Sequence, residues 1–261
     1  MARARSKRIG LHTHVLEHGH EEIAQRFVVI AFKSVVLAVF AGLLLMFLGF
    51  RALPVESTPL VAKVMCLLSL SIAAGGVGAY LGRNIQSLIA VIGLFLLAMV
   101  GMFVVRAAGG GYVAVGLLMG WSAIFGMLSG PLISYAIAEE GPGIVIQSLT
   151  GTTAVMIITG IVAMTSGINF SALGPILMIG LLGLIVVGLV RIFVRFSRTV
   201  NIVYSIFGIL IFSGLFLFKF FNLSKSENTW DRAVDMTISL YLTFANFFSY
   251  LLQFLLSSRR R

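Results

Sequence analysis

Long apolar runs separated by short polar stretches dominate the chain. A membrane-spanning helix needs about 20 predominantly apolar residues, so we divide the chain wherever a charge, a proline or a glycine cluster interrupts such a run. The pattern predicts eight transmembrane segments: Phe27–Phe50, Leu60–Leu81, Gln86–Val105, Tyr112–Ala138, Gly143–Ser166, Leu173–Phe196, Val200–Phe221 and Ala233–Leu256. The predicted fold class is therefore all-α, a polytopic membrane bundle of eight transmembrane helices. The connections are short, which leaves no room for a domain outside the membrane.

Composition supports a membrane protein. Hydrophobic residues make up 59% of the chain and charged residues 11%, and the mean hydropathy is +1.06; soluble domains have roughly 45–50% apolar and about 25% charged residues. The net charge of +10 would suggest nucleic acid as the partner of a soluble protein. Here the basic residues lie at segment ends, so we expect the lipid bilayer as partner and no nucleic acid.

The basic residues also predict an orientation. With a cytoplasmic N-terminus, the outside loops hold Arg51, Arg106, Lys225 and Arg232. The inside loops and tails hold Arg3, Arg5, Lys7, Arg8, Arg26, Arg83, Arg191, Arg195, Arg198, Arg259, Arg260 and Arg261. Twelve against four is a positive-inside bias, and an even number of spans returns the C-terminus to the inside. Both termini are therefore predicted to be cytoplasmic.

The first 26 residues are predicted to form a cytoplasmic tail that is basic and contains histidines. His14 and His18 are four residues apart and could share a metal on a helix. Gly19 and the lack of a closed ligand set weigh against that site, so we predict no metal and no cofactor. Glu17 and two further acids depart from the acid-poor composition of a transit peptide. A bacterial cytoplasmic (inner) membrane is favoured over the mitochondrial inner membrane.

Several segments resemble the transmembrane Bax inhibitor motif family, also called the Bax inhibitor-1 family. The segments are Lys63–Gly82, Met119–Pro131, Ile146–Met156 and Ile238–Phe248. The resemblance runs from about Leu60 to the C-terminus and implies a seven-helix core over residues 60–261. Residues 27–59 then form an extra transmembrane helix and loop. The extra helix, with Ala98–Arg106, is similar to the mitochondrial inner-membrane branch of the family.

The resemblance implies a chemistry that two residues of this chain do not match. Family members are understood to leak or regulate calcium in a pH-dependent way through two facing carboxylates on their last two helices. Close carboxylates in a medium of low dielectric cannot both ionise, which would make the pair a pH sensor. In this sequence Lys219 and Thr243 occupy those two positions. A lysine would repel a divalent cation by several kcal/mol, so the calcium site does not carry over.

Other polar residues are candidates for an ion pathway or sensor. Asp235 precedes Thr243 by eight residues, or a little more than two helical turns, so the two residues are expected on nearly the same face of the helix. Both it and Lys219 are expected near the outer ends of adjacent helices, where they form an ion pair or stay separately solvated. Glu139 and Glu140 fall in a short inner turn and form either a cation-attracting mouth or a solvated turn.

Asn246 lies about midway along the last segment and matches the family pattern. It and the threonines of the fifth segment are expected to make hydrogen bonds between helices, with a polar pathway as the alternative. The chain offers no catalytic constellation, so we do not expect an enzyme. Two functions stay open: an ion leak channel or regulator of ion homeostasis, and a non-conducting regulatory or structural subunit. The lost acidic pair and the extra helix favour a subunit that binds another membrane protein, such as a membrane protease.

Overall fold

The computed structural model describes residues 58–194 and 196–259. These residues form seven α-helices and no strand. The helices are α2 (Leu60–Gly82), α3 (Leu88–Ala107), α4 (Tyr112–Glu140), α5 (Gly143–Thr165), α6 (Leu173–Phe193), α7 (Arg198–Lys225) and α8 (Trp230–Arg259). All seven contain a stretch long and apolar enough to cross a membrane. The all-α membrane bundle is confirmed for this part of the chain, whereas the predicted segment Phe27–Phe50 lies outside the described residues.

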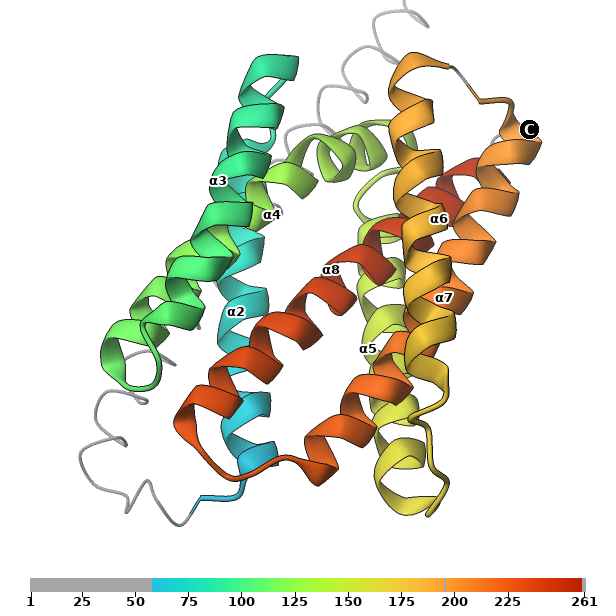
Figure 1. Ribbon diagram of the computed structural model, residues 1–261. Helices are drawn as coiled ribbons and strands as arrows, with labels where there is room; N and C mark the ends of the chain where they lie inside the picture. The colour runs from blue at the N-terminus through green and yellow to red at the C-terminus, as the bar shows by residue number, and fades with distance from the viewer. Residues whose placement is uncertain (1–57, 195, 260–261) are drawn as a thin grey trace, which may run out of the picture. The chain divides into compact units, whose positions relative to one another are not determined.

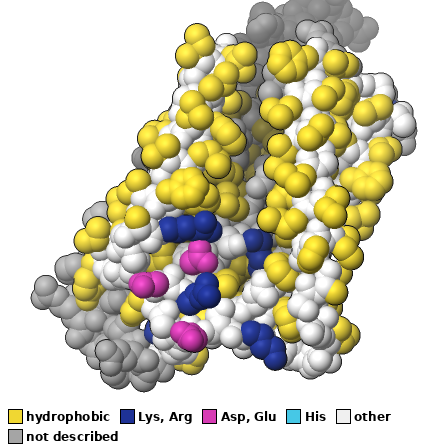
Figure 2. Space-filling model, viewed as in Figure 1, with side chains coloured by type: hydrophobic (Ala, Val, Ile, Leu, Met, Phe, Trp, Pro, Cys, Tyr) yellow, Lys and Arg dark blue, Asp and Glu magenta, His cyan; other side chains and the backbone are white. Residues whose placement is uncertain are grey.

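Helix α8 is the centre of the described bundle. It packs against α2, α3, α4, α5 and α7, and Figure 1 shows it running obliquely across α2. Helices α3 and α6 lie at the periphery, where α3 packs against α4 and α8, and α6 packs against α7. Apolar side chains cover their outward faces (Figure 2). Such faces suit lipid, because acyl chains solvate apolar side chains as well as a protein core does.

The bundle has two polar ends. We call the end at which α2, α4 and α8 begin and α3 and α7 finish the Asp235 end. The opposite end, at which α4 and α8 finish, is the Glu140 end. In Figure 2 the basic and acidic side chains of the visible face gather in one band towards the Asp235 end, below columns of hydrophobic side chains.

The last two helices are longer than the hydrophobicity pattern predicts. The expected connection over 222–232 shrinks to residues 226–229 between α7 and α8. The predicted boundaries were wrong because polar and charged residues mark where the apolar stretch ends, and a helix can continue past that level. Thr229 helps start α8, since its hydroxyl accepts a hydrogen bond from the backbone N–H of Arg232 at 3.2 Å.

The predicted turn of Glu139 and Glu140 is corrected in the same way. Both glutamates belong to the last turn of α4. The helix stops at Gly141, whose φ of +76° lies in the left-handed region that favours glycine. Pro142 follows and precedes the first residue of α5.

Close contact between α2 and α4 fixes the core beside α8. A Cβ added at Gly126 would lie 2.1 Å from the carbonyl oxygen of Gly75, and one at Gly78 would lie 1.9 Å from that of Ala123. Small residues therefore let the two backbones touch. At Gly116 and Gly120 a Cβ would meet nothing within 4 Å, so these two glycines are not needed for packing among the described residues.

Candidate functional site

Lys219 of α7 faces α8 near the Asp235 end. Its ammonium donates a hydrogen bond to the hydroxyl of Ser239, which lies one turn before Thr243 on α8. Thr243 is buried, and its own hydroxyl donates to the carbonyl of Ser239 at 2.9 Å. Lys219 therefore contacts α8 at Ser239, a residue that sequence reasoning did not single out and that lies one turn before Thr243. A cation and two neutral hydroxyls occupy the α7–α8 contact at this level.

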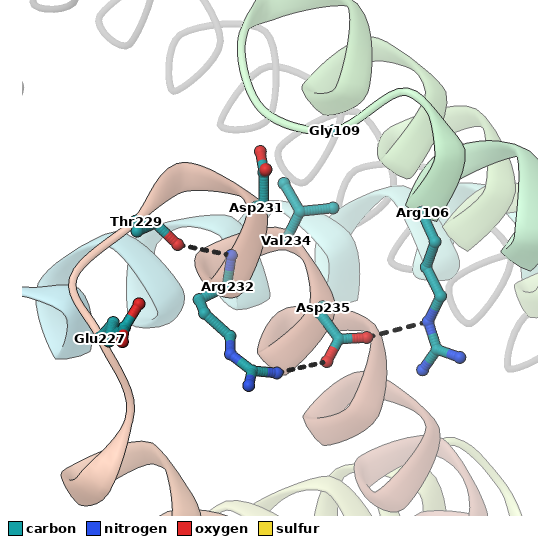
Figure 3. Close-up of a pocket in the computed structure, with 8 residues that line it drawn as sticks. All are labelled: Arg106, Gly109, Glu227, Thr229, Asp231, Arg232, Val234 and Asp235. Carbon is teal, nitrogen blue, oxygen red and sulfur yellow. Dashed lines mark hydrogen bonds and ion pairs between the residues drawn. The ribbon is translucent and has the colours of Figure 1, made fainter.

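Asp235 pairs with arginines (Figure 3). Its carboxylate lies 2.9 Å from Nε of Arg106 on α3 and 3.8 Å from Nη1 of Arg232 on α8. The sequence left open an ion pair with Lys219 or separate solvation, and Asp235 follows neither alternative, because its carboxylate pairs with Arg106. Asp235 and Arg106 are nevertheless close enough to act electrostatically on the Lys219 ammonium, the first attracting it and the second repelling it.

A pocket of about 380 Å³ opens beside this ion pair. It lies between the end of α3 and the start of α8 and is lined by Arg106, Gly109, Glu227, Thr229, Asp231, Arg232, Val234 and Asp235. Figure 3 shows the guanidinium groups of Arg106 and Arg232 approaching Asp235 from two sides. The pocket therefore carries both signs of charge at the boundary of the apolar bundle.

Lys63 at the start of α2 belongs to the same end. The sequence suggests that its long side chain reaches the interface, but the residue is only 5% exposed. Its ammonium donates to the side-chain oxygen of Asn228 at 3.0 Å and lies 5.1 Å from the ring centre of Trp230. Asn228 in turn donates to the backbone carbonyl of Thr58 at 3.0 Å. The α7–α8 connection is thereby tied to the start of α2.

The Glu140 end is held by arginines. The carboxylate of Glu140 lies 3.9 Å from Nη1 of Arg259, the last residue of α8, while Glu139 is exposed. Arg259 also donates to the side-chain oxygen of Gln147 on α5 at 2.6 Å. The contact with Arg259 gives Glu140 a role that neither open interpretation, a cation-attracting mouth or a solvated turn, includes: it joins α4 to α8.

The polar residues within the helices mostly bond to their own backbone. Asn246, half-buried on α8, donates to the carbonyl of Leu242 at 2.8 Å. Thr152 and Thr159 of α5 donate to carbonyls four residues earlier, at 2.7 Å each. The expectation of bonds between helices is wrong for these three side chains, because a hydroxyl or amide in a helix can reach a carbonyl of the preceding turn.

Comparison with known proteins decides the family. The family model described as "Inhibitor of apoptosis-promoting Bax1" matches residues 57–261, which include every described helix. The chain belongs to the Bax inhibitor family. The expected membership is therefore confirmed, and the chain is a multi-pass membrane protein of this family.

Relatives of this Bax inhibitor family member are bacterial proteins. A protein of Borreliella burgdorferi is 28% identical over 210 residues, which cover 74% of this chain and 90% of the relative. A membrane protein of Vibrio cholerae is 33% identical over 140 residues, or 52% of this chain and 61% of the relative. A Streptococcus pyogenes membrane protein is 28% identical over 136 residues, covering 50% and 59%. The last two are named as uncharacterized membrane proteins, and the matched part spans about three fifths of each.

Proposed function

We propose that this Bax inhibitor family protein regulates the passage of ions across its membrane, without the carboxylate pair that the family resemblance implies. The observation that carries the proposal is the contact of Lys219 with Ser239, one turn from Thr243. The contact of Lys219 with α8, one turn from Thr243, supports a joint role of the two positions expected for the carboxylates, with a positive charge at one of them in place of a negative one.

The charge at this contact favours monovalent ions over calcium. A divalent cation 4 Å from a lysine ammonium would be repelled by about 8 kcal/mol at an effective dielectric of 20, twice the value for two unit charges. Asp235 cannot fully offset this repulsion, because its carboxylate already neutralises Arg106. We therefore expect any leak through this contact to exclude calcium.

Flux measurements in liposomes test the proposal. The purified protein should increase the leak of potassium or chloride, and Lys219→Met should change the ratio of the two, because it removes the charge but keeps an apolar chain of similar length. Lys225→Met is the matched control, since Lys225 lies at the end of the same helix and its ammonium sits over the ring of Phe221, 5.8 Å from its centre. Flux equal to that of empty liposomes for all three proteins would refute the proposal.

A non-conducting regulatory subunit is the second candidate. It is favoured by Gly116 and Gly120, which are exposed on α4 and have no described neighbour within 4 Å of a Cβ. Glycines four residues apart on an exposed helix face permit close approach of another helix in lipid. Purification in mild detergent should then return a stoichiometric membrane protein, and Gly116→Leu with Gly120→Leu should remove it. Recovery of the protein alone would count against this candidate.

A further inference from the structure

Two hydroxyl groups in the middle of the bundle have no hydrogen-bond partner within residues 58–194 and 196–259. Ser71 on α2 and Ser122 on α4 are both 0% exposed, and the side-chain oxygen of each is unpaired among the described residues. A buried hydroxyl without a partner costs about 1–3 kcal/mol by protein mutational data. A hydrogen bond from each hydroxyl to another polar group of the chain, or to a ligand, would remove this cost.

The other buried hydroxyls of the helices avoid this cost. Each of the other buried serines and threonines of the described helices donates to a backbone carbonyl four residues earlier, which is the usual solution for these residues in an apolar helix. The examples are Ser148, Thr152, Ser205, Thr237 and Thr243. Ser71 and Ser122 are exceptions to this pattern, which indicates that their hydroxyls are directed at something else.

The packing of α2 on α4 brings the two exceptions opposite each other. Gly75 touches Gly126 within the close contact of the two helices, which run in the same direction. Ser71 precedes Gly75 by four residues and Ser122 precedes Gly126 by four, so both lie one turn from this contact on the facing sides. The register therefore directs the two serines to the same level between α2 and α4.

Tyr241 of α8 supplies a third polar group at this level. Its hydroxyl donates to the backbone carbonyl of Ser122 at 2.8 Å, and a Cβ added at Gly75 would lie 2.2 Å from the same hydroxyl. The phenolic oxygen can still accept a hydrogen bond. The ring is held by Trp121 and Phe125, with centroids 5.5 and 5.9 Å away, and the residue is 3% exposed.

The helices also separate beyond this level. Gly116 precedes Ala123 by seven residues, which is almost two helical turns, so the two residues lie on nearly the same face of α4. At Ala123 the backbone touches Gly78, whereas at Gly116 a Cβ would meet nothing within 4 Å. The backbone contact between α2 and α4 therefore does not extend to Gly116, two turns before Ala123.

We propose that Ser71, Ser122 and Tyr241 bind a single water molecule between α2, α4 and α8. Each serine hydroxyl donates to or accepts from the water, and the tyrosine oxygen accepts from it, which gives the three bonds typical of buried water. The site lies inside the bundle, apart from the Lys219 contact and the charged pocket, and it does not depend on whether the protein conducts ions.

Radiolytic hydroxyl labelling tests the site, because radiolysis converts a bound water into a radical that modifies adjacent side chains. In the intact protein in detergent, Tyr241 should be labelled although it is buried, whereas Phe216 and Phe247, which are equally buried, should not. The double variant Ser71→Ala with Ser122→Ala should lower the labelling of Tyr241 to the level of those two phenylalanines. Equal labelling of Tyr241 in both proteins, or none in either, would overturn the proposal.

Thermal unfolding of the same variants is a second, independent test of the bound water. If the serines share a water, each single Ser→Ala change lowers Tm, and the double variant loses no more than the larger single loss, because one change already releases the ligand. Ser69→Ala is the control, since Ser69 is exposed on α2 and bonds to the carbonyl of Met65. A rise in Tm for both single variants would mean that the hydroxyls are merely unpaired and would exclude the water.

Discussion

At the scale of single residues, the charges of the Asp235 end are arranged around one carboxylate. Asp235 is the shared partner of Arg106 and Arg232, and Lys219 lies within its electrostatic reach. Removing its charge leaves Arg106, Arg232 and Lys219 without the carboxylate that they share. The side chains of Asp235 and Arg106 are 35% and 42% exposed, so water screens much of the resulting repulsion.

Asp235→Asn should therefore destabilise the protein by about 1 kcal/mol. For a domain of this size that loss lowers Tm by roughly 2–4 °C. Asp231→Asn is the matched control, because Asp231 lines the same pocket one turn earlier on α8. Thermal unfolding in detergent measures both. An equal decrease in Tm for Asp235→Asn and Asp231→Asn would show that the ion pair of Asp235 with Arg106 does not add to stability.

Some residues of the site follow from the sequence and others do not. The family resemblance singled out Lys219 and Thr243; Lys219 contacts Ser239, one turn from Thr243, and a joint role of the two residues stays a prediction. Arg106 could not be assigned to Asp235, because the contact of α3 with α8 joins segments that are far apart in the sequence. Ser71 and Ser122 were missed for a different reason. The sequence does not show whether the hydroxyl of a serine in an apolar run donates a hydrogen bond to a backbone carbonyl of its own helix.

At the scale of helices, the α2–α4 contact depends on individual glycines. Gly126→Ala would bring a methyl group to 2.1 Å from the carbonyl oxygen of Gly75, which is backbone and cannot rotate away. We expect a loss of at least about 1–3 kcal/mol, the usual cost of overpacking. Gly116→Ala on the same helix should be neutral or raise stability by up to about 1 kcal/mol through helix propensity. Equal effects on Tm would contradict the observed contact.

The end of α8 depends on an arginine from α7. Arg198 donates from Nε to the carbonyl of Ser257 at 2.8 Å and from Nη2 to that of Ser258 at 3.0 Å, which satisfies carbonyls that have no partner within the helix. Arg198→Gln should weaken the last turn of α8 by about 1 kcal/mol. Hydrogen exchange over residues 255–259 should then be about fivefold faster. Arg83→Gln is the control, because Arg83 lies over Tyr80 on α2, and an equal acceleration in both would refute the capping role.

The helices were predicted well and their ends less well. Seven of the apolar segments correspond to α2–α8, because satisfying every backbone group inside a bilayer leaves the helix as the natural structure for such runs. The ends of α7 and α8 were placed too early or too late. Charged residues such as Lys225 and Arg232 interrupt the apolar pattern, whereas α7 ends before Ser226 and α8 begins after Thr229.

At the scale of the whole molecule, the predicted orientation places the Asp235 end outside the cell. In a Cys66→Ser background, Glu227→Cys at the Asp235 end should react with a membrane-impermeant maleimide added to intact cells, because the α7–α8 connection is exposed. Ser258→Cys at the other end should react only after the membrane is opened. The reverse result would invert the positive-inside assignment.

The central claim is that a reversed charge between α7 and α8 keeps this Bax inhibitor family member from passing calcium. The most direct measurement is calcium entry into liposomes that contain the protein and enclose a calcium-sensitive dye. We predict no entry with the wild-type protein and clear entry with Lys219→Asp combined with Thr243→Asp, because the double change places two carboxylates around Ser239. Equal calcium entry with the wild-type protein and the double variant, whether present or absent in both, would show that the charge at Lys219 does not control the passage of calcium.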